Sequence, residues 1–395
     1  MDYKFGFVGM MYMKVRLGNY IEEYSKKNKA DEDIPVYSVT STQGFCRDYF
    51  GKEVASKDKT TYKIVPQGCF AYNPSRINVG SVDWQRNEER VIVSPLYNVF
   101  SVSEELDQEY LYYYLKSDFA LQRIRAVATG SVRDNLKLEM LKEFPILLPP
   151  KNDQKTIANN LDRVKRIIEL RKSEIDKMNE LIKARFVEMF GDLANPECLW
   201  NKSKLIEVCV DKDDIKCGPF GTQLSKDEYM ESGIAVWEIP QINTAFKSRP
   251  VHFITSEKAE QLKAYTIIPG DIAMSRKGNV GKCAIFPENY PAGIIHSDVL
   301  RIRINSQLVN PTFMMCQLHF SGAITRQIEL VSSGAIMAGV NVTKLKQIYV
   351  HIPPIELQSQ FADFVRAIDK SKVAVQKALE KTQLLFDSLM QQYFG

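Results

Sequence analysis

Residues 149–191 read PPKNDQKTIANNLDRVKRIIELRKSEIDKMNELIKARFVEMFG, and residues 353–395 read PPIELQSQFADFVRAIDKSKVAVQKALEKTQLLFDSLMQQYFG. The two segments have the same length, begin with Pro-Pro and close with Phe-Gly. They align without a gap at an offset of 204 residues. The chain therefore carries one long segment twice, and this repeat decides how the rest of the sequence is interpreted.

Apolar residues recur in both segments at alternating steps of four and three residues. In the first segment these positions are Ile157, Leu161, Val164, Ile168, Ile175, Met178 and Ile182. In the second they are Phe361, Val365, Ile368, Val375, Leu379, Phe386 and Leu389. This spacing places one narrow apolar seam along a helix, and such a seam needs a partner helix. The Pro-Pro pairs fit helix starts and Gly191 fits a left-handed cap, so each helix would run for roughly 37 residues, or about 55 Å.

Three arrangements would bury these seams. The helices could form a coiled coil between two copies of the chain, or each could be buried in a separate domain. Alternatively, two matched helices in one chain satisfy each other's seams when the long segment between them brings the chain back. We favour this last arrangement, an antiparallel intramolecular pair.

The repeat continues upstream of both helices. Residues 62–81 resemble residues 265–282: each has an apolar run ending in Pro and Gly, a second short apolar run, a polar loop and Asn-Val-Gly. Residues 90–102 resemble 292–304, and both show the apolar alternation of strands. After each of these strand regions we expect one amphipathic helix. The two helices are expected around residues 107–126 and 311–328.

The order along the chain is therefore domain, helix, domain, helix. We expect an α+β protein with two mixed α/β domains separated by two long antiparallel coiled-coil helices, related as a pseudo-twofold tandem duplication. The expected boundaries are 1–148, 149–191, 192–352 and 353–395. The polar loops differ more than the apolar frames, as two recognition modules for different targets would show. Neutral drift after duplication would leave the same pattern.

Composition limits the class of protein and its location. The chain has 395 residues, a net charge of +4 and a pI of about 8.5, which permits a nucleic-acid partner without demanding one. Seven scattered cysteines without a CxxC favour reduced thiols in the cytoplasm. The four histidines lie far apart, so no zinc spacing appears, and we expect no metal site. No secretory signal and no membrane-spanning run is expected.

Several motifs are similar to those of a known family. They are Pro149-Pro150 with Gln154, Pro353-Pro354 with Gln358, TGS at 129–131, SSGA at 332–335, AYNPSRINVGS at 71–81, and CGPFGTQLSKDEYMESGIAVWEIPQI at 217–242. The whole chain resembles the specificity subunit of Type I restriction–modification systems, and Gly218 to Gly221 is its most specific motif. The first domain has no Gly-Pro-Phe-Gly, so its entry loop cannot be assigned by this resemblance.

The resemblance implies a non-catalytic DNA reader. Two target recognition domains would each read one half of a split site in double-stranded DNA, and the helices would hold them apart and dock two methyltransferase subunits. It also implies a restriction, or translocase, subunit as a further partner. S-adenosylmethionine would bind the methyltransferase subunits, so no cofactor is expected on this chain.

A rigid helical spacer suits such a reader. Half-sites one turn of B-DNA apart, about 34 Å, lie on one face of the duplex. Paired helices of about 55 Å can span that distance, whereas a flexible linker would lose the register. An alternative function is a coiled-coil adaptor that joins two partner-binding domains without DNA.

The sequence offers little support for catalysis. AYNPSR lacks the second proline and the aromatic residue of an amino-methyltransferase loop, and RKGNVGK at 276–282 lacks the phosphate-loop spacing. We therefore expect no enzyme activity in this chain, and we expect Tyr72 to belong to the core.

The polar loops are better explained as DNA contacts. Lysine and arginine neutralise phosphates, while arginine and asparagine also read base edges. The candidates in the first domain are Arg47, Lys52, Arg76, Asn78, Arg86 and Arg90, and those in the second are Thr222, Gln223, Ser275, Arg276, Lys277, Asn279 and Lys282.

Overall fold

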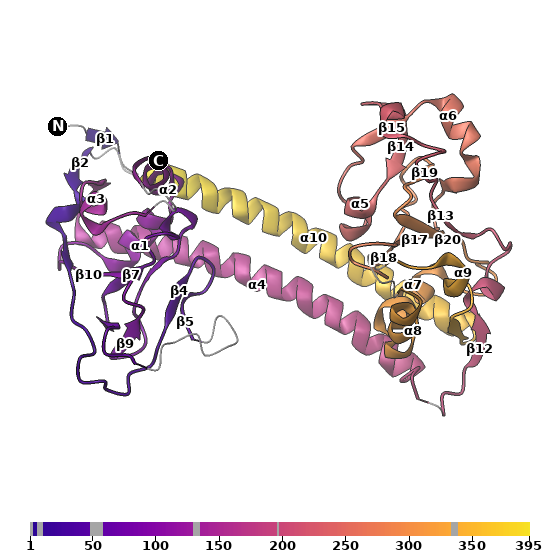
Figure 1. The fold of residues 1–395 in the computed structure, drawn as a ribbon, viewed down its shortest axis with the longest axis horizontal. Coiled ribbons are helices and arrows are strands. Elements are labelled where there is room, and N and C mark those ends of the chain that lie inside the picture. The colour runs from indigo at the N-terminus through magenta and orange to yellow at the C-terminus, as the bar shows by residue number, and fades with distance from the viewer. Residues whose placement is uncertain (1–2, 6–10, 48–57, 129–134, 196, 333–338) are drawn as a thin grey trace. The chain divides into compact units, whose positions relative to one another are not determined.

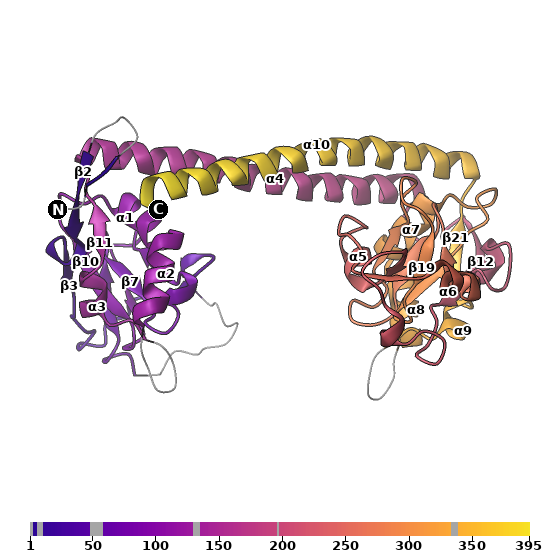
Figure 2. The same cartoon turned by 90° about the horizontal axis from the view of Figure 1, so that it is seen from above.

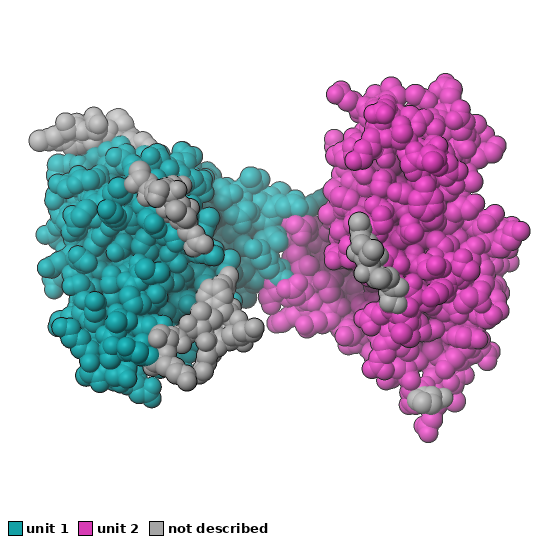
Figure 3. Space-filling view, viewed as in Figure 1, with its two compact units in different colours: residues 1–172, 377–395 teal, residues 173–376 magenta. Residues whose placement is uncertain are grey.

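The computed structural model describes residues 3–5, 11–47, 58–128, 135–195, 197–332 and 339–395. The chain forms two compact units (Figure 3). Unit 1 comprises residues 1–172 and 377–395, and unit 2 comprises residues 173–376. The division passes through both long helices, so each unit contains part of each helix.

The two repeated segments form helices α4 (Lys151–Phe190) and α10 (Ile355–Phe394), each of 40 residues. A helix of this length is about 60 Å long. Both begin directly after their Pro-Pro pair. Proline is tolerated there because the first backbone N–H groups of a helix have no partner within the helix. Gly191 follows α4 with a φ of 74°, the left-handed conformation that ends many helices.

The helices pair in opposite directions within each unit (Figures 1 and 2). In unit 1, Leu161 near the start of α4 belongs to the same apolar cluster as Leu389 near the end of α10. In unit 2, the rings of Phe186 and Phe190 at the end of α4 lie 5.5 and 5.6 Å from the ring of Phe361 at the start of α10. The chain therefore pairs its own two helices antiparallel, as the apolar spacing indicated. Every predicted seam residue is buried or half-buried.

Unit 1 is built mainly from short antiparallel strands. Its four-stranded sheet has the order β3-β10-β7-β8 and contains β3 (Ile21–Glu23), β7 (Phe70–Tyr72), β8 (Val82–Trp84) and β10 (Asn98–Val102). Its other strands are β1 (Tyr3–Phe5), β2 (Met11–Arg16), β4 (Ser38–Thr40), β5 (Gly44–Cys46), β6 (Lys63–Pro66), β9 (Arg90–Val93) and β11 (Pro145–Leu147). Its helices besides the long pair are α1 (Gln108–Lys116), α2 (Asp118–Val127), α3 (Leu138–Lys142) and the 3-10 helices η1 (Leu17–Asn19) and η2 (Ile77–Val79).

Unit 2 repeats the central four-stranded sheet and differs in the sheets around it. Its four-stranded sheet β13-β20-β17-β18 contains β13 (Ile215–Cys217), β17 (Ile272–Ser275), β18 (Cys283–Ile285) and β20 (Val299–Ile302). A second sheet, β15-β14-β19-β16, contains β14 (Ile234–Trp237), β15 (His252–Ile254), β16 (Thr266–Ile267) and β19 (Gly293–Ile295), while β12 (Asn201–Lys204) pairs with β21 (Tyr349–Ile352). Its helices are α5 (Ile239–Asn243), α6 (Ser256–Gln261), α7 (Pro311–Phe320), α8 (Gly322–Ser332), α9 (Val342–Leu345), η3 (Leu205–Val208), η4 (Lys226–Glu228) and η5 (Lys263–Tyr265).

The duplication is visible in the strand registers. In unit 1, Tyr72 of β7 pairs with Val82 of β8, and in unit 2 Met274 of β17 pairs with Cys283 of β18. Helices α1 and α2 correspond to α7 and α8, so the expected helices at 107–126 and 311–328 are each two helices. Ser117 explains the first break, because its backbone is extended and its hydroxyl accepts a hydrogen bond from Ala120 N, which starts a new helix.

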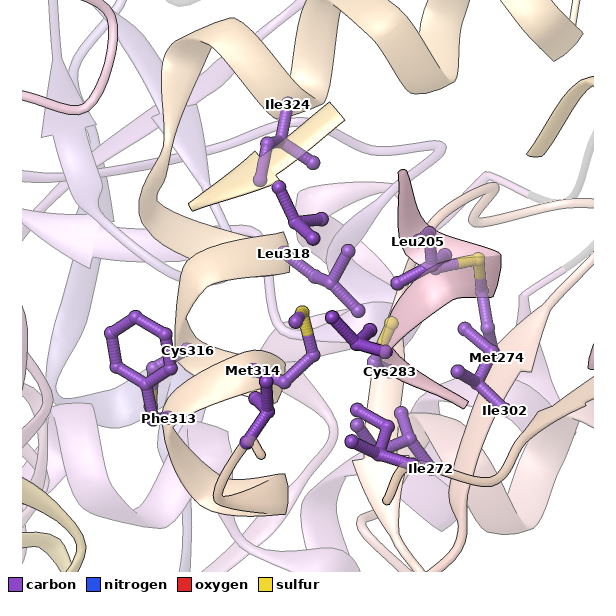
Figure 4. Packing of buried hydrophobic residues seen from close by; sticks show 14 of the residues in the cluster. Leu205, Ile272, Met274, Cys283, Ile302, Phe313, Met314, Cys316, Leu318 and Ile324 are labelled. Atoms are coloured by element: carbon purple, nitrogen blue, oxygen red, sulfur yellow. The ribbon is translucent and has the colours of Figure 1, made fainter. Parts of the chain in front are cut away.

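The four-stranded sheet of unit 1 packs against α1, and the four-stranded sheet of unit 2 packs against α7. Tyr72 is buried in the core of unit 1 together with α1, as expected from the sequence. Figure 4 shows the equivalent core of unit 2, in which Met314 and Leu318 of α7 point toward Cys283 of β18. Each such side chain contributes about 1.5–3 kcal/mol when fully buried. Among the described residues, no helix has both the length and the apolar character needed to cross a membrane.

A buried glutamine ties each long helix to its own unit. Gln154 accepts a hydrogen bond from Asp107 N at 2.7 Å and donates one to Pro149 O at 2.8 Å. Gln358 accepts one from Asn310 N at 2.9 Å and donates one to Pro353 O at 2.7 Å. Asp107 and Asn310 in turn cap α1 and α7. The Gln of each Pro-Pro segment therefore joins the start of a long helix to the start of a short one.

Candidate nucleic-acid interface

The loop between β7 and β8 in unit 1 is fixed by hydrogen bonds within the loop itself. The side chain of Asn73 accepts hydrogen bonds from Ser75 N at 3.1 Å and from the Ser75 hydroxyl at 3.0 Å. Ile77 is buried beneath the loop, and Gly80 adopts a left-handed φ of 83° that returns the chain to β8. The loop is therefore a fixed bend that can present side chains in defined directions.

Two of the predicted DNA contacts lie on this bend. Arg76 is exposed, and its side chain has no hydrogen bond or ion pair to another residue that the structure describes. Asn78 is half-buried, and its backbone oxygen accepts a hydrogen bond from Arg125 Nε at 3.3 Å. Together these two residues can bind DNA: the unpaired arginine can bind a phosphate, and either side chain can hydrogen-bond to a base edge.

The loop between β17 and β18 occupies the same place in unit 2. Its Asn279-Val280-Gly281 aligns with Asn78-Val79-Gly80, and Gly281 has a φ of 82°, close to that of Gly80. Asn279 and Lys282 are exposed, and the Lys282 side chain has no polar partner within the described part of the chain. Ser275, in contrast, is fully buried in β17, so its hydroxyl offers no surface for a DNA contact here.

The cations at the start of this loop are occupied within unit 2. The guanidinium of Arg276 donates to Val340 O at 3.3 Å and to Ser297 O at 3.4 Å. Lys277 forms an ion pair with Asp298 at 2.8 Å. Arg276 thus holds neighbouring backbone segments together, while Lys277 remains half-buried against a carboxylate. Sequence reasoning placed both in one contact set because these long-range partners are invisible in the loop itself.

The Gly-Pro-Phe-Gly turn lies beside this loop. A side chain at Gly218 would place its Cβ 2.2 Å from Ile295 O and 2.3 Å from His296 O, so only glycine fits. Phe220 is 52% exposed, and the Arg276 guanidinium lies 5.4 Å from the centre of its ring. Sequence reasoning missed Phe220, although an aromatic residue inside a tight polar turn is itself a signal of a binding surface.

Two predicted contacts follow this turn. Thr222 and Gln223 are both exposed. The Gln223 side-chain oxygen accepts a hydrogen bond from the Tyr265 hydroxyl at 2.9 Å. The amide nitrogen of Gln223 therefore remains the group free to donate to a ligand, because the oxygen is already used.

Arg86 in unit 1 belongs to a charged network. Its guanidinium lies 2.7 Å from Asp83 and 3.2 Å from Glu109, and it also covers the rings of Trp84 and Tyr112. Burial opposes the charged form of Arg86, but the carboxylates of Asp83 and Glu109 outweigh it and raise the pKa. A phosphate would have to compete with two carboxylates and two rings for this side chain.

The remaining candidates of unit 1 are peripheral. Arg47 lies 3.7 Å from Glu88, and Arg90 lies 2.7 Å from Glu32, both as exposed ion pairs. Exposed pairs contribute about 0–1 kcal/mol, so either arginine can leave its partner for a phosphate at little cost. Lys52 lies outside the described residues, as do the TGS motif at 129–131 and part of SSGA at 332–335.

No group of three or more His, Cys, Asp or Glu suited to a metal ion occurs in the described ranges. All seven cysteines are free thiols. The polar groups that converge in each unit are thus the cations and amides of the strand-connecting loops. They are suited to binding a polyanion through phosphates and base edges.

Known proteins share both the sequence pattern and the fold. The Type I restriction modification DNA specificity domain matches residues 15–180 and again residues 199–384. The Type I restriction enzyme MjaVIII specificity subunit of Methanocaldococcus jannaschii is 22% identical over 392 residues, covering 93% of this chain and 90% of the relative. The putative MjaX specificity subunit of the same organism is 22% identical over 389 residues, covering 90% and 87%.

Two solved structures have the same fold. A chain from a structure of a type I R-M system has a TM-score of 0.58 at 16% identity and covers 100% of this chain and 99% of its own. The type I S subunit from M. genitalium has a TM-score of 0.57 at 16% identity, with 97% and 96% covered. Because the relatives are named specificity subunits, the expectation of a recognition component rather than an enzyme is confirmed. With the family domain matched twice along it, this chain belongs to the Type I restriction modification DNA specificity family.

Proposed function

We propose that this chain is the specificity subunit of a Type I restriction–modification complex, in which unit 1 and unit 2 each read one half of a bipartite site in double-stranded DNA. The observation that carries the proposal is the repeated loop. Each unit connects equivalent strands through a bend that ends in a left-handed glycine and presents an unpaired cation, Arg76 or Lys282. An asparagine lies beside each cation, Asn78 in one unit and Asn279 in the other.

These groups supply both kinds of DNA contact. Cations on phosphates provide affinity and register, while an arginine or asparagine on a base edge contributes about 1–3 kcal/mol of discrimination. The exposed Thr222 and Gln223 extend the surface in unit 2, where Lys277 would have to leave Asp298 to take part, and Arg47 and Arg90 extend it in unit 1. Each loop differs in sequence, so each unit would prefer a different half-site.

The long helices would bind two methyltransferase subunits. Leu181 of α4 and Leu385 of α10 stand at equivalent positions, 204 residues apart, and are 48% and 51% exposed. Exposed apolar side chains at equivalent places on the two helices are available for a protein partner to bury. One such leucine in each unit suits two copies of the same partner, which would carry S-adenosylmethionine and the methyl transfer. A restriction, or translocase, subunit would join the same assembly.

Exchange of unit 2 tests the proposal. Residues 200–350 are replaced by those of a relative, the chain is expressed with its methyltransferase, and genomic DNA is sequenced for modified adenine. We expect one half of the methylated site to change and the other half to stay. A site changed in both halves, or in neither, contradicts two independent readers. An adaptor that binds no DNA predicts no change at all.

Co-purification tests the helical docking surface. We expect two methyltransferase chains for each copy of this chain, measured by native mass spectrometry. Leu181→Glu and Leu385→Glu should each remove one of the two. A complex that keeps both partners in the double variant contradicts docking at these leucines.

A further inference from the structure

Lys116 joins two separate loops of unit 1. It lies in the last turn of α1, where its side chain is partly buried. Its ammonium group donates hydrogen bonds to the backbone oxygen of Gly80 and, at 3.2 Å, to that of Ser41. Gly80 ends the β7–β8 loop, and Ser41 begins the turn between β4 and β5. One side chain therefore spans two segments that are about 40 residues apart in sequence.

Both loops face solvent beside the proposed reading surface. Ser41, Thr42 and Gln43 are exposed in the β4–β5 turn, and Arg76 is exposed in the β7–β8 loop. The stem of Lys116 packs directly on Gly80, since a Cβ there would lie 3.5 Å from the lysine Cδ. The spacing between the two loops is thus set by Lys116 together with Asp83 of β8, whose side chain accepts a hydrogen bond from Phe45 N of β5 at 3.2 Å.

Unit 2 supports its loop through other side chains. Counted from the helix caps Asp107 and Asn310, the position equivalent to Lys116 is His319, whose Nε2 accepts a hydrogen bond from Cys283 N at the start of β18 at 2.9 Å. The β17–β18 loop is also supported by Arg276, and a Cβ on Gly281 would lie 3.2 Å from Ile328. The two loops therefore have the same backbone shape at their terminal glycine and different supports.

We propose that Lys116 is a positioning residue for unit 1: it fixes the β4–β5 turn against the β7–β8 loop so that both contribute to reading one half of the DNA site. This inference rests on the proposed function, because it assumes that the β7–β8 loop meets DNA. It assigns the exposed Ser41, Thr42 and Gln43 to the same reading surface, which no sequence motif indicated.

The surroundings of Lys116 make the bridge sensitive to pH. Burial lowers the pKa of Lys116 to about 8; Asp83 opposes the shift, and Lys165 and Arg86 add to it. Tyr112, whose ring lies 5.5 Å from the ammonium, has a pKa raised mainly by burial and stays neutral. Above pH 8 the neutral amine donates weaker hydrogen bonds to the two carbonyls.

The effect on stability has the opposite sign. The pKa of Lys116 falls from 10.5 to about 8 on folding, so the unfolded chain holds this proton up to a higher pH. Stability contributed by this group therefore rises between pH 8 and 10.5. A loss of DNA reading over this range would not be caused by Lys116 destabilising the fold.

The test compares discrimination in the two half-sites. The full chain is assembled with its methyltransferase, and methylation rates are measured on duplexes that carry one wrong base in either half. Lys116→Met should lose about tenfold discrimination in the half read by unit 1 and none in the other. Lys116→Arg, which keeps charge and donors, should retain both. Lys165→Met is the matched control, because Lys165 lies over the same Tyr112 ring and binds neither loop.

A pH series separates positioning from simple folding. In the unaltered protein, discrimination in the unit 1 half should fall between pH 7 and pH 9, while the other half stays constant; in Lys116→Arg both should stay constant. Equal loss in both halves, or none with Lys116→Met, overturns the inference. If the complex of the unaltered chain with its methyltransferase methylates no specific site, the result contradicts the proposed function and not the role of Lys116. The pH series needs no Met variant, so it decides the question even if that variant does not fold.

Discussion

Unit 1 and unit 2 share a frame and differ in what supports their loops. Both contain the same four-strand order and a left-handed glycine before the last strand. In unit 1 an ammonium group holds the loop, whereas in unit 2 the loop borders an open pocket of about 680 Å³ lined by Leu318, Phe320 and Ile328. The comparison teaches that the apolar registers preserve the fold, and that the loops above them can be held by unrelated contacts.

The helix pair differs between the units in the same way. In unit 1, Arg171 fills a seam position and donates hydrogen bonds to Ala378 O and to the Thr382 hydroxyl. The positions 204 residues away in unit 2 are Val375 and Met178, both apolar. A single polar pair in an apolar seam selects one register among several. Unit 1 thus has a polar pair that favours one alignment of the helices, and the equivalent pair in unit 2 is apolar.

The largest expected effect comes from breaking the seam in one unit at a time. Ile168→Asp would bury a carboxylate in the helix seam of unit 1 and cost about 3–5 kcal/mol. Val375→Asp in unit 2 should cost less, because Val375 is only half-buried. Urea unfolding measures both, and Val187→Asp on the exposed side of α4 is the control. Equal costs for Ile168→Asp and Val187→Asp would contradict the seam.

A smaller effect is expected at the turn that only unit 2 possesses. Gly218→Ala forces a Cβ against the backbone of Ile295 and His296 and should cost about 1–3 kcal/mol. It should also weaken reading of the half-site assigned to unit 2, measured by methylation of single-base variants. Gly221→Ala is the control, since a Cβ there meets nothing within 4 Å. An effect on the other half-site would show that the units are not independent.

The smallest effect is expected at the unpaired cations, whose removal should change the salt dependence of DNA binding. It allows the contributions of the two units to be compared directly. Arg76→Ala and Lys282→Ala each remove one positive group from equivalent loops, so each should reduce the salt dependence of DNA binding by about 0.9 in the logarithmic slope. Binding of the assembled complex at several salt concentrations measures this. Lys263→Ala, which removes a lysine paired with Glu260, should leave the slope unchanged. If Arg76 also reads a base, only its variant will relax sequence preference.

The helices and the duplication could be predicted from the sequence, whereas the loop supports could not. The two seams, Ile157 to Ile182 and Phe361 to Leu389, follow a period that favours paired helices. Ser117 gave no comparable signal, because a serine inside an amphipathic pattern can also be an ordinary helical residue. Side-chain partners far apart in sequence, such as Arg86 with Glu109, were equally hidden. Candidate cations were therefore recognised by type, and only the structure separates the paired ones from Arg76 and Lys282.

If the units are the recognition modules proposed above, the buried glutamines would make them interchangeable. Gln154 and Gln358 bind only main-chain atoms of their units: Gln154 those of Asp107, Glu105 and Pro149, and Gln358 those of its counterparts in unit 2. A foreign module would meet the same requirement with any residue except proline at the donor position, because every other residue offers an amide hydrogen as well as a carbonyl oxygen. Recombination between genes of this kind could thus trade one module for another without a compensating mutation at the junction, and new DNA preferences could arise in a single genetic step.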